Sequence, residues 1–288
     1  MVFIKFLFIL SFSFSFDMVS NKAFELLNIN GQKTEIIFEA PEIKIEKDEE
    51  GFSKFITDDM IGMTMEDNFP ELPIHSSMFQ MTPGMEYDIE YEVLSSYLIE
   101  GINFKSLDNN QSSIYPNDNI SLSEPLIMRG LVLGQISFIP YKYSFENKTL
   151  EVYEAVQITI SESHNSEFNY FVPEKRSYIF EDLYENFVIN YTRSDRSEDY
   201  QIPSILYICG GNSINNAYFQ DLINWRHKQG YIVTAVSTSE TGSSENNINN
   251  YIANAYTTWE NPPEIVGLVG DVGGSYNIDC DSYQWSGY

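Results

Sequence analysis

Short alternations of apolar and polar residues fill the first two thirds of the chain. They run through "TEIIFEAPEIKIE" (34–46) and "MEYDIEYEVLSSYLIEG" (85–101), and residues 125–163 predict three more strands, with "ENKT" (146–149) as a hairpin turn. A period of two places successive side chains on opposite faces of a sheet, and regularly placed Gly, Pro, Asn and Asp mark the turns. The pattern predicts a β-rich antiparallel domain, either a sandwich or a barrel-like fold.

The pattern changes in the last third of the chain, where apolar runs alternate with helical periodicity. The runs at 204–211, 231–238 and 265–270 predict strands, and the segments between them, 215–230 and 243–259, carry apolar residues at three-and-four spacing. Strands without a polar face are typical of a parallel sheet covered by helices on both sides. We therefore expect an α/β domain, and three strands are only part of such a sheet.

Each predicted helix has one apolar face and recognisable end signals. The first helix is expected to bury one face and to stop at Gly230; that face holds Tyr218, Phe219, Leu222, Ile223 and Trp225. The second helix opens with serine caps and ends before Pro262, and its apolar face holds Ile248, Tyr251, Ile252, Ala255, Tyr256 and Trp259.

A single aspartate, Asp271, follows the last predicted strand in "IVGLVGDVGG" (265–274). In open parallel sheets, ligand-binding and catalytic groups lie at the carboxyl ends of the strands. A carboxylate there is able to cap a helix or shape a turn, to bind a cation, or to act as a base, and the residues alone leave these roles open. No G-x-x-x-x-G-K-[ST] or G-x-G-x-x-G motif is present, which argues against phosphate binding.

The composition is strongly acidic, with 42 acidic against 16 basic residues and a net charge of −26. Such a chain does not suit nucleic acid, whose phosphates are met by Lys and Arg, or an anionic membrane surface. Its charge fits a soluble, exported surface, and carboxylates are also the oxygen ligands that calcium takes. At 288 residues and 43% hydrophobic content, two packed domains are expected.

The N-terminus predicts export. "MVFIKFLFILSFSFSF" has one lysine, Lys5, and then an apolar run over 6–10 that is too short to cross a bilayer, which takes about 20 residues. It fits a secretory signal cleaved after Ser15, so we expect a secreted, extracellular or cell-surface protein. No other segment predicts a membrane span.

Two cysteines, Cys209 and Cys280, are present. They are able to pair in an exported protein, but the sequence does not decide whether they do. Two thiols are too few for a structural zinc site, which takes about four ligands. The residues favour Cys209 as a small buried side chain and Cys280 as a loop thiol or half of a disulfide.

The segment "ENFVINYTRSDRSEDYQIP" (185–203) separates the two patterns and is polar. It is either an ordinary linker or a processing site at Arg193 and Arg196, because exposed polar segments are where proteolysis concentrates.

Several motifs in the right order carry a resemblance to a known family. Residues 203–271 contain "INWRHKQGYIVTAV", "INNYIANAYTTW" and "PPEIVGLVGD", and they resemble the start of the catalytic domain of gingipain-type cysteine peptidases. "EPLIMRGLVLGQISFIPYKYSFENKTLEVYEAVQITI" (124–160) resembles the propeptide domain of the same family. The resemblance covers most of the chain after its predicted signal.

The resemblance implies a secreted zymogen with a caspase-like α/β domain, in which a His–Cys dyad hydrolyses peptide bonds and a β-rich propeptide keeps the enzyme latent. In the family the histidine stands in a His-Gly pair after a later strand, and the cysteine follows the next strand. None of His75, His164 and His227 precedes a glycine, and neither cysteine matches. The dyad is therefore expected beyond residue 288, and this fragment by itself is not expected to cleave peptides.

The family also implies a calcium site to which Asp271 contributes. The expected organisation is a signal peptide over 1–15, a β-rich propeptide domain over 16–185, a linker or processing segment over 186–202, and the N-terminal part of the catalytic domain over 203–288. The expected partners are a protein or peptide substrate and, within the chain, a propeptide strand or loop lying over the substrate cleft.

Other interpretations stay open from the sequence. Arg129 is a cation inside an apolar strand and is expected either to be paired or solvent-facing, or to take part in latency. The main alternative function is a secreted, non-catalytic surface or binding protein with a caspase-like fold. A flavodoxin-like ligand-binding domain is a weaker alternative, since no phosphate-cradling loop is found.

Overall fold

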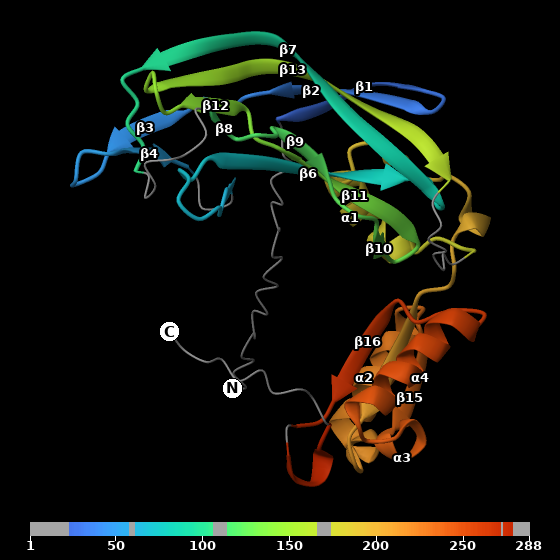
Figure 1. The fold of residues 1–288 in the computed structure, drawn as a ribbon. Helices are drawn as coiled ribbons and strands as arrows, with labels where there is room; N and C mark the ends of the chain where they lie inside the picture. Colours follow the sequence, from blue (N-terminus) through green and yellow to red (C-terminus); the bar gives the residue numbers. More distant parts are fainter. Residues whose placement is uncertain (1–22, 58–60, 106–113, 166–173, 272, 279–288) are drawn as a thin grey trace, which may run out of the picture.

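The computed structural model describes residues 23–57, 61–105, 114–165, 174–271 and 273–278 (Figure 1). The predicted signal peptide and Cys280 lie outside these residues. The first part of the chain is built of strands: β1 Phe24–Asn30, β2 Lys33–Glu39, β3 Lys44–Lys47, β4 Ser53–Ile56, β5 Gly62–Met63, β6 Pro73–Met81, β7 Met85–Glu100, β8 Ile114–Tyr115, β9 Ile120–Leu122, β10 Leu126–Met128, β11 Leu131–Phe138, β12 Tyr141–Ser144 and β13 Thr149–Asn165.

The later part of the chain alternates strands and helices, after a short helix α1, Glu181–Phe187, that follows β13. Its elements are β14 Ser204–Cys209, α2 Ala217–Lys228, β15 Ile232–Ser237, α3 Thr238–Thr241, α4 Glu245–Thr258 and β16 Ile265–Val269. No helix in the described ranges combines the length and the apolar character that crossing a membrane requires.

Two larger antiparallel sheets and a two-stranded antiparallel sheet of β3 and β4 form the first part (Figure 1). One has the order β1-β2-β13-β12-β8, with the long strand β7 paired along β13, and the other has the order β10-β11-β6-β5, with β9 on β11. Alternation fixes which side chains are buried: on β13, Val156, Ile158 and Ile160 are inaccessible to solvent while the intervening residues are polar. The predicted β-rich antiparallel part is confirmed.

The main core lies where side chains from both sheets meet. Phe38 of β2 packs edge-on against Phe138 of β11, with ring centres 4.9 Å apart, and such aromatic contacts add to the hydrophobic gain. The other buried members of this core are Phe24, Ile36, Phe79, Met81, Val132, Ile136, Tyr153, Val156, Ile158 and Ile160.

The last part is a parallel sheet with the order β15-β14-β16 among the described strands. Every residue of the central strand β14 is buried. Ile205, Tyr207 and Cys209 pack with Phe219 of α2, whereas Leu206 and Ile208 pack with Ile248 and Ala255 of α4. The two helices therefore cover opposite faces of the sheet, as the unbroken apolar strands predicted.

Some expectations differ from the structure. Residues 125–163 hold four strands, not three, because β10 and β11 are separated by a tight turn at Arg129–Gly130, both with positive φ. On α2, Tyr218 is 85% exposed and Trp225 is 51% exposed, so these two residues do not lie on the buried face. Among the described residues of that helix, Phe219, Leu222 and Ile223 pack with the side chains of β14.

Candidate functional site

Asp271 lies at the carboxyl end of β16, where the sequence placed it. Its backbone pairs with a following turn: its N–H donates to the Tyr276 carbonyl at 3.0 Å, and its own carbonyl accepts from Ile278 at 3.0 Å. Residue 271 is exposed. The aspartate thus closes a small backbone loop while its carboxylate remains near solvent.

The glycines around this edge are explained by close backbone packing. The segment 275–277 folds back over the ends of β14 and β16, and a Cβ on Gly210 or Gly270 would collide with the carbonyl of Tyr276. Gly211, with φ +52°, meets the carbonyl of Ser275 in the same way. Side chains at these positions would push the loop off the sheet, so only glycine fits.

Few described side chains at the carboxyl edge of the parallel sheet are able to bind calcium. Among the described residues, no group of three or more His, Cys, Asp or Glu side chains is arranged to hold a metal ion. Asp279 and Asp281, the neighbouring acidic residues, lie outside the described residues. Asp271 supplies one carboxylate at a suitable edge, and calcium takes 6–8 oxygen ligands, so the described residues form only part of such a site.

Cys209 is a buried, free cysteine at the end of β14. Burial raises the pKa of its thiol, although the neighbouring Ser213 hydroxyl opposes this shift. A thiol whose pKa is raised is a poor nucleophile at neutral pH, because the thiolate is the reactive form. Ile205, Tyr207 and Phe219 are the buried residues in the same hydrophobic cluster as Cys209.

The three histidines sit in three different settings. His75 is buried in β6 against the ring of Phe38, His164 pairs with Glu86 at an exposed position, and His227 lies near the end of α2, with Nδ1 3.3 Å from the Tyr231 carbonyl. The described residues therefore contain no Cys–His pair that would serve as a dyad.

The two linker arginines, Arg193 and Arg196, are held in different ways. The Arg193 guanidinium contacts Asp182 and Glu185 of α1, each at 3.1 Å. Arg196 pairs with Asp199, at 2.8 Å, and its side chain is 69% exposed. Both lie in the segment that the sequence singled out, but of the two only Arg193 contacts α1.

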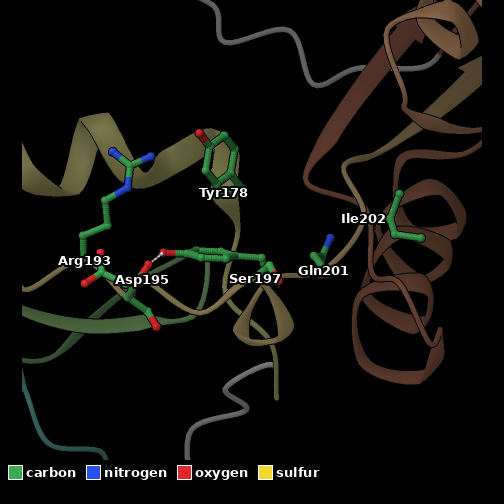
Figure 2. Close-up of a pocket in the computed structure, with 8 residues that line it drawn as sticks. Tyr178, Arg193, Asp195, Ser197, Gln201 and Ile202 are labelled. Atoms are coloured by element: carbon green, nitrogen blue, oxygen red, sulfur yellow. Dashed lines mark hydrogen bonds between the residues drawn. The ribbon is translucent and has the colours of Figure 1, made fainter.

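An open pocket of about 530 Å³ lies along this linker (Figure 2). Figure 2 shows Arg193 extending alongside Tyr178, with Gln201 and Ile202 at the other end of the pocket. The Tyr200 hydroxyl donates to the Ser194 carbonyl at 2.7 Å, which closes the linker into a compact loop. The pocket therefore marks the junction between the two parts of the chain.

Arg129 makes the main polar contact across this junction. Its Nη2 donates to Gln201 Oε1 at 2.7 Å and to the Pro262 carbonyl at 3.1 Å, and the guanidinium lies 5.2 Å from the ring centre of Tyr256. On the side of the β-rich part, the Tyr184 hydroxyl of α1 donates to the Arg129 carbonyl at 2.7 Å. The sequence could not reveal this contact, because its partners lie far apart along the chain.

The contact lies at the end of the sheet opposite Asp271. Gln201 and Pro262 precede β14 and β16, whereas Asp271 follows β16. In Figure 1 the β16 arrow correspondingly points away from the antiparallel sheets of the first part. The described junction therefore meets the amino ends of the strands, and not the carboxyl ends, where the sequence placed the functional groups.

Glu264 is a buried carboxylate beside the junction. Its Oε2 accepts from the backbone N–H of Ser204 at 3.1 Å. Burial raises the pKa of Glu264, while the Ser177 hydroxyl, the Ser204 N–H and the charge of Arg129 lower it. Arg129 thus also offsets part of the cost of burying a carboxyl group.

Comparison with known proteins relates both parts to one family. The model of peptidase family C25 matches residues 198–281, and the model of the C25 propeptide matches residues 68–198. Gingipain R2 of Porphyromonas gingivalis is 27% identical over 169 residues, covering 56% of this chain. Gingipain R1 of the same species is 25% identical over 232 residues, covering 72% of this chain. The chain spans 23% of the length of each of these relatives.

Two solved structures are also similar. The complex of RgpB pro- and mature domains from Porphyromonas gingivalis is 21% identical, with a TM-score of 0.45 over 60% of this chain and 100% of that chain. A structure of gingipain K from the same species, described in terms of zymogenic latency, is 14% identical, with a TM-score of 0.39 over 49% of this chain and 92% of that chain.

The two family matches adjoin at residue 198, in the order propeptide then peptidase, and together they extend from residue 68 to residue 281. The chain belongs to the gingipain-type peptidases of family C25, and it carries the propeptide and part of the catalytic domain.

Proposed function

We propose that this protein is the secreted zymogen of a cysteine endopeptidase with a caspase-like catalytic domain. The observation that carries the proposal is the adjoining pair of family matches, which join a propeptide to the start of a peptidase domain. The reaction is peptide-bond hydrolysis: a cysteine thiolate attacks the scissile carbonyl, and a histidine transfers the proton to the leaving amine. The substrate is a protein or peptide.

The nucleophile of this proposal is not Cys209. That thiol is enclosed by the β14–α2 core, and burial raises its pKa. The dyad is proposed to come from catalytic-domain residues outside the described part of the chain. The domain boundaries proposed are those of the sequence pattern, with the propeptide over 16–185, the linker over 186–202 and the catalytic part from 203.

The propeptide is proposed to hold the catalytic part in place during folding and to keep it latent. Support for the first role comes from Arg129, which bridges a propeptide turn to Gln201 and Pro262, the residues that precede β14 and β16. Latency would require a further contact of the propeptide at the carboxyl edge of the sheet, over the substrate cleft.

A direct experiment is expression of the natural reading frame with everything that follows residue 288. Activated enzyme should hydrolyse a mixed peptide library, and alkylation by iodoacetamide should abolish the activity. Propeptide 17–190 added in trans should slow turnover. A full-length product that hydrolyses no peptide would instead indicate a secreted, non-catalytic binding protein, and unchanged turnover with added propeptide would remove the latency role.

We further propose that Asp271 is one ligand of a structural calcium ion. Asp271 is an exposed residue that follows the carboxyl end of β16, and carboxylate oxygens are ligands that calcium takes. The test is calcium titration of the full-length protein and of its Asp271→Asn variant by calorimetry, with thermal melting as a second readout. Equal affinity and equal stabilisation by calcium in the two proteins would exclude Asp271 from the site.

A further inference from the structure

Glu264 is a buried carboxyl group at the junction between the propeptide part and the catalytic part. It directly precedes β16, and only 8% of the residue is exposed. Its Oε2 accepts from the Ser204 N–H, whereas its Oε1 is buried and makes no hydrogen bond within the described structure. Burying an ionised carboxylate costs free energy unless its oxygens are paired. The charged form of Glu264 is therefore poorly accommodated in the attached state of the two parts.

The cation of the junction does not form an ion pair with this carboxyl group. The Nη2 of Arg129 donates instead to two neutral acceptors, Gln201 Oε1 and the Pro262 carbonyl, and its Nε is buried without a partner among the described residues. No ion pair of the described residues includes Glu264. Burial raises the pKa of Glu264, and the charge of Arg129 offsets only part of this shift.

The groups that cover Glu264 come from both parts of the chain. Ser177 and Arg129 belong to the propeptide side, and Ser204 is the first residue of β14. The Ser177 hydroxyl is close enough to lower the pKa of Glu264, yet it is itself buried without a completed hydrogen bond in the described structure. When the two parts separate, the propeptide groups leave and water reaches the carboxyl group. The separated state therefore accommodates the carboxylate better than the attached state does.

The other titratable groups of this region do not replace the missing partner. Tyr184 of α1 interacts electrostatically with Tyr256 of α4, with Glu181 of α1 and with Glu264. Burial is the main cause that raises the pKa of Tyr184, so its phenol carries no charge that would balance Glu264. Glu181 has a partner on its own side, because its Oε1 accepts from the Tyr191 hydroxyl at 2.7 Å.

We infer that Glu264 is a proton-controlled switch for the attachment of the two parts: the neutral acid favours the attached state, and the carboxylate weakens it. The attached state binds a proton more readily than the separated state, because burial raises the pKa of Glu264 above its ordinary value of 4.5. Attachment through this group is therefore fully favoured below pH 4.5 and is weakened as the pH rises above that value.

This switch has a consequence for the proposed zymogen. The propeptide would be held most tightly in acid and released more readily near neutral pH. This consequence rests on the proposed function, whereas the pH-dependent attachment rests on the junction alone and needs no peptidase activity.

The test is hydrogen exchange of the full chain, followed at the Gln201 amide, which donates to the Arg176 carbonyl across the junction at 3.0 Å. Glu264→Gln keeps an acceptor for Ser204 but binds no proton. The ratio of Gln201 protection in this variant to that in the unaltered protein should rise at least about threefold between about pH 5 and pH 8. Groups that titrate elsewhere act equally in both proteins and cancel in this ratio.

Glu260→Gln is the matched control, because Glu260 is an exposed carboxyl group in the same connection, and its ratio should stay level across this pH range. In the unaltered protein, Gln201 should also exchange faster than Ile208 of the central strand β14, because the junction opens without unfolding the sheet. A level or falling ratio for Glu264→Gln, or equal exchange of Gln201 and Ile208, would overturn the inference.

A second measurement covers the case in which Glu264→Gln does not fold. The Glu264 carboxyl carbon of the unaltered protein is followed by NMR as the pH is changed. A titration midpoint above pH 4.5 is expected, and a midpoint at or below that value would show that the attached state does not favour the neutral acid. Neither measurement depends on catalysis, so a failure here is distinct from a failure of the proposed peptidase function.

Discussion

The side chain of Arg129 and the carbonyl of Pro262 are joined by a hydrogen bond of 3.1 Å, although 133 residues separate them. The same carbonyl accepts from Gln201 Nε2 at 3.0 Å and from Ser204 Oγ at 2.7 Å. The Pro262 carbonyl oxygen thus accepts hydrogen bonds from the propeptide, the linker and the first strand of the parallel sheet. Burial away from water strengthens such a network and makes the loss of any member costly.

Arg129→Ala should therefore destabilise the catalytic part of the chain. The variant removes two charge-assisted hydrogen bonds and the cation that offsets Glu264, which together should cost about 2–3 kcal/mol. The sequence places all three tryptophans, Trp225, Trp259 and Trp285, after the linker, so denaturant unfolding followed by tryptophan fluorescence reports this part selectively.

Arg129→Lys is the matched variant for that experiment. It keeps the positive charge but not the planar fork that reaches two acceptors, so an intermediate loss is expected. If Arg129→Ala unfolds at the same denaturant concentration as the unaltered protein, the junction contact does not stabilise the catalytic part.

Tyr184→Phe tests the other side of the same turn. The buried Tyr184 hydroxyl donates to the Arg129 carbonyl at 2.7 Å and lies 3.1 Å from the Met128 carbonyl. Removing it leaves buried carbonyls without this donor, which should cost about 1–2 kcal/mol. Because both residues fix one turn, the loss in the Tyr184→Phe, Arg129→Ala double variant should be smaller than the sum of the single losses. Strict additivity, measured by the same fluorescence unfolding, would mean that the hydroxyl and the guanidinium act independently.

Local signals in the sequence predicted much of the fold because they depend on neighbouring residues. Ser244 caps α4 by accepting from the Asn247 N–H, Gly230 stands just after α2 with φ +92°, and the "ENKT" turn joins β12 to β13. Period-two alternation likewise predicted the long strand β7. Each of these features needs only a few adjacent residues to be recognised.

Contacts between distant residues were not predictable in this way. Arg129 appeared to lie inside an apolar strand, whereas it occupies a turn with φ +34° and reaches across to the other part of the chain. Tyr218 and Trp225 fit the helical spacing of an apolar face but are exposed. The role of Gly210 and Gly270 was similarly hidden, because the loop that packs on them comes from residues 275–277.

His75 should make the propeptide part sensitive to acid. It is buried beside Phe38, and its Nε2 makes no hydrogen bond within the described structure. Burial lowers the pKa of His75 from 6.5 to about 4. Above pH 6.5, His75 is neutral in both the folded and the unfolded chain, and the folded state has its full stability. As the pH falls toward 4, the unfolded chain takes up the proton first, and the folded state loses stability. The full loss amounts to about 3 kcal/mol.

His75→Leu should reduce this pH dependence, since leucine binds no proton. Hydrogen exchange of β6 and β11, measured between pH 7 and pH 4, should show a smaller loss of protection in the variant than in the unaltered protein. His164→Gln is the control, because His164 is exposed and pairs with Glu86 at the surface. Parallel loss of protection in the His75→Leu variant and the unaltered protein would show that other groups cause the acid sensitivity.

Gly270→Ala should separate the edge loop from the parallel sheet. The added Cβ meets the Tyr276 carbonyl and the side chain of Ile278, which packs with Leu206 and Ile208. Because a backbone carbonyl has little freedom to move aside, the loop has to shift, at a cost of about 1–3 kcal/mol.

Gly62→Ala is the control for Gly270→Ala, since its Cβ would lie 3.8 Å from the nearest atom. Faster hydrogen exchange confined to 273–278, together with weaker calcium stabilisation if Asp271 is a ligand, is the expected result. Unchanged exchange in that segment would mean that the glycine is not needed for the loop to pack against the sheet.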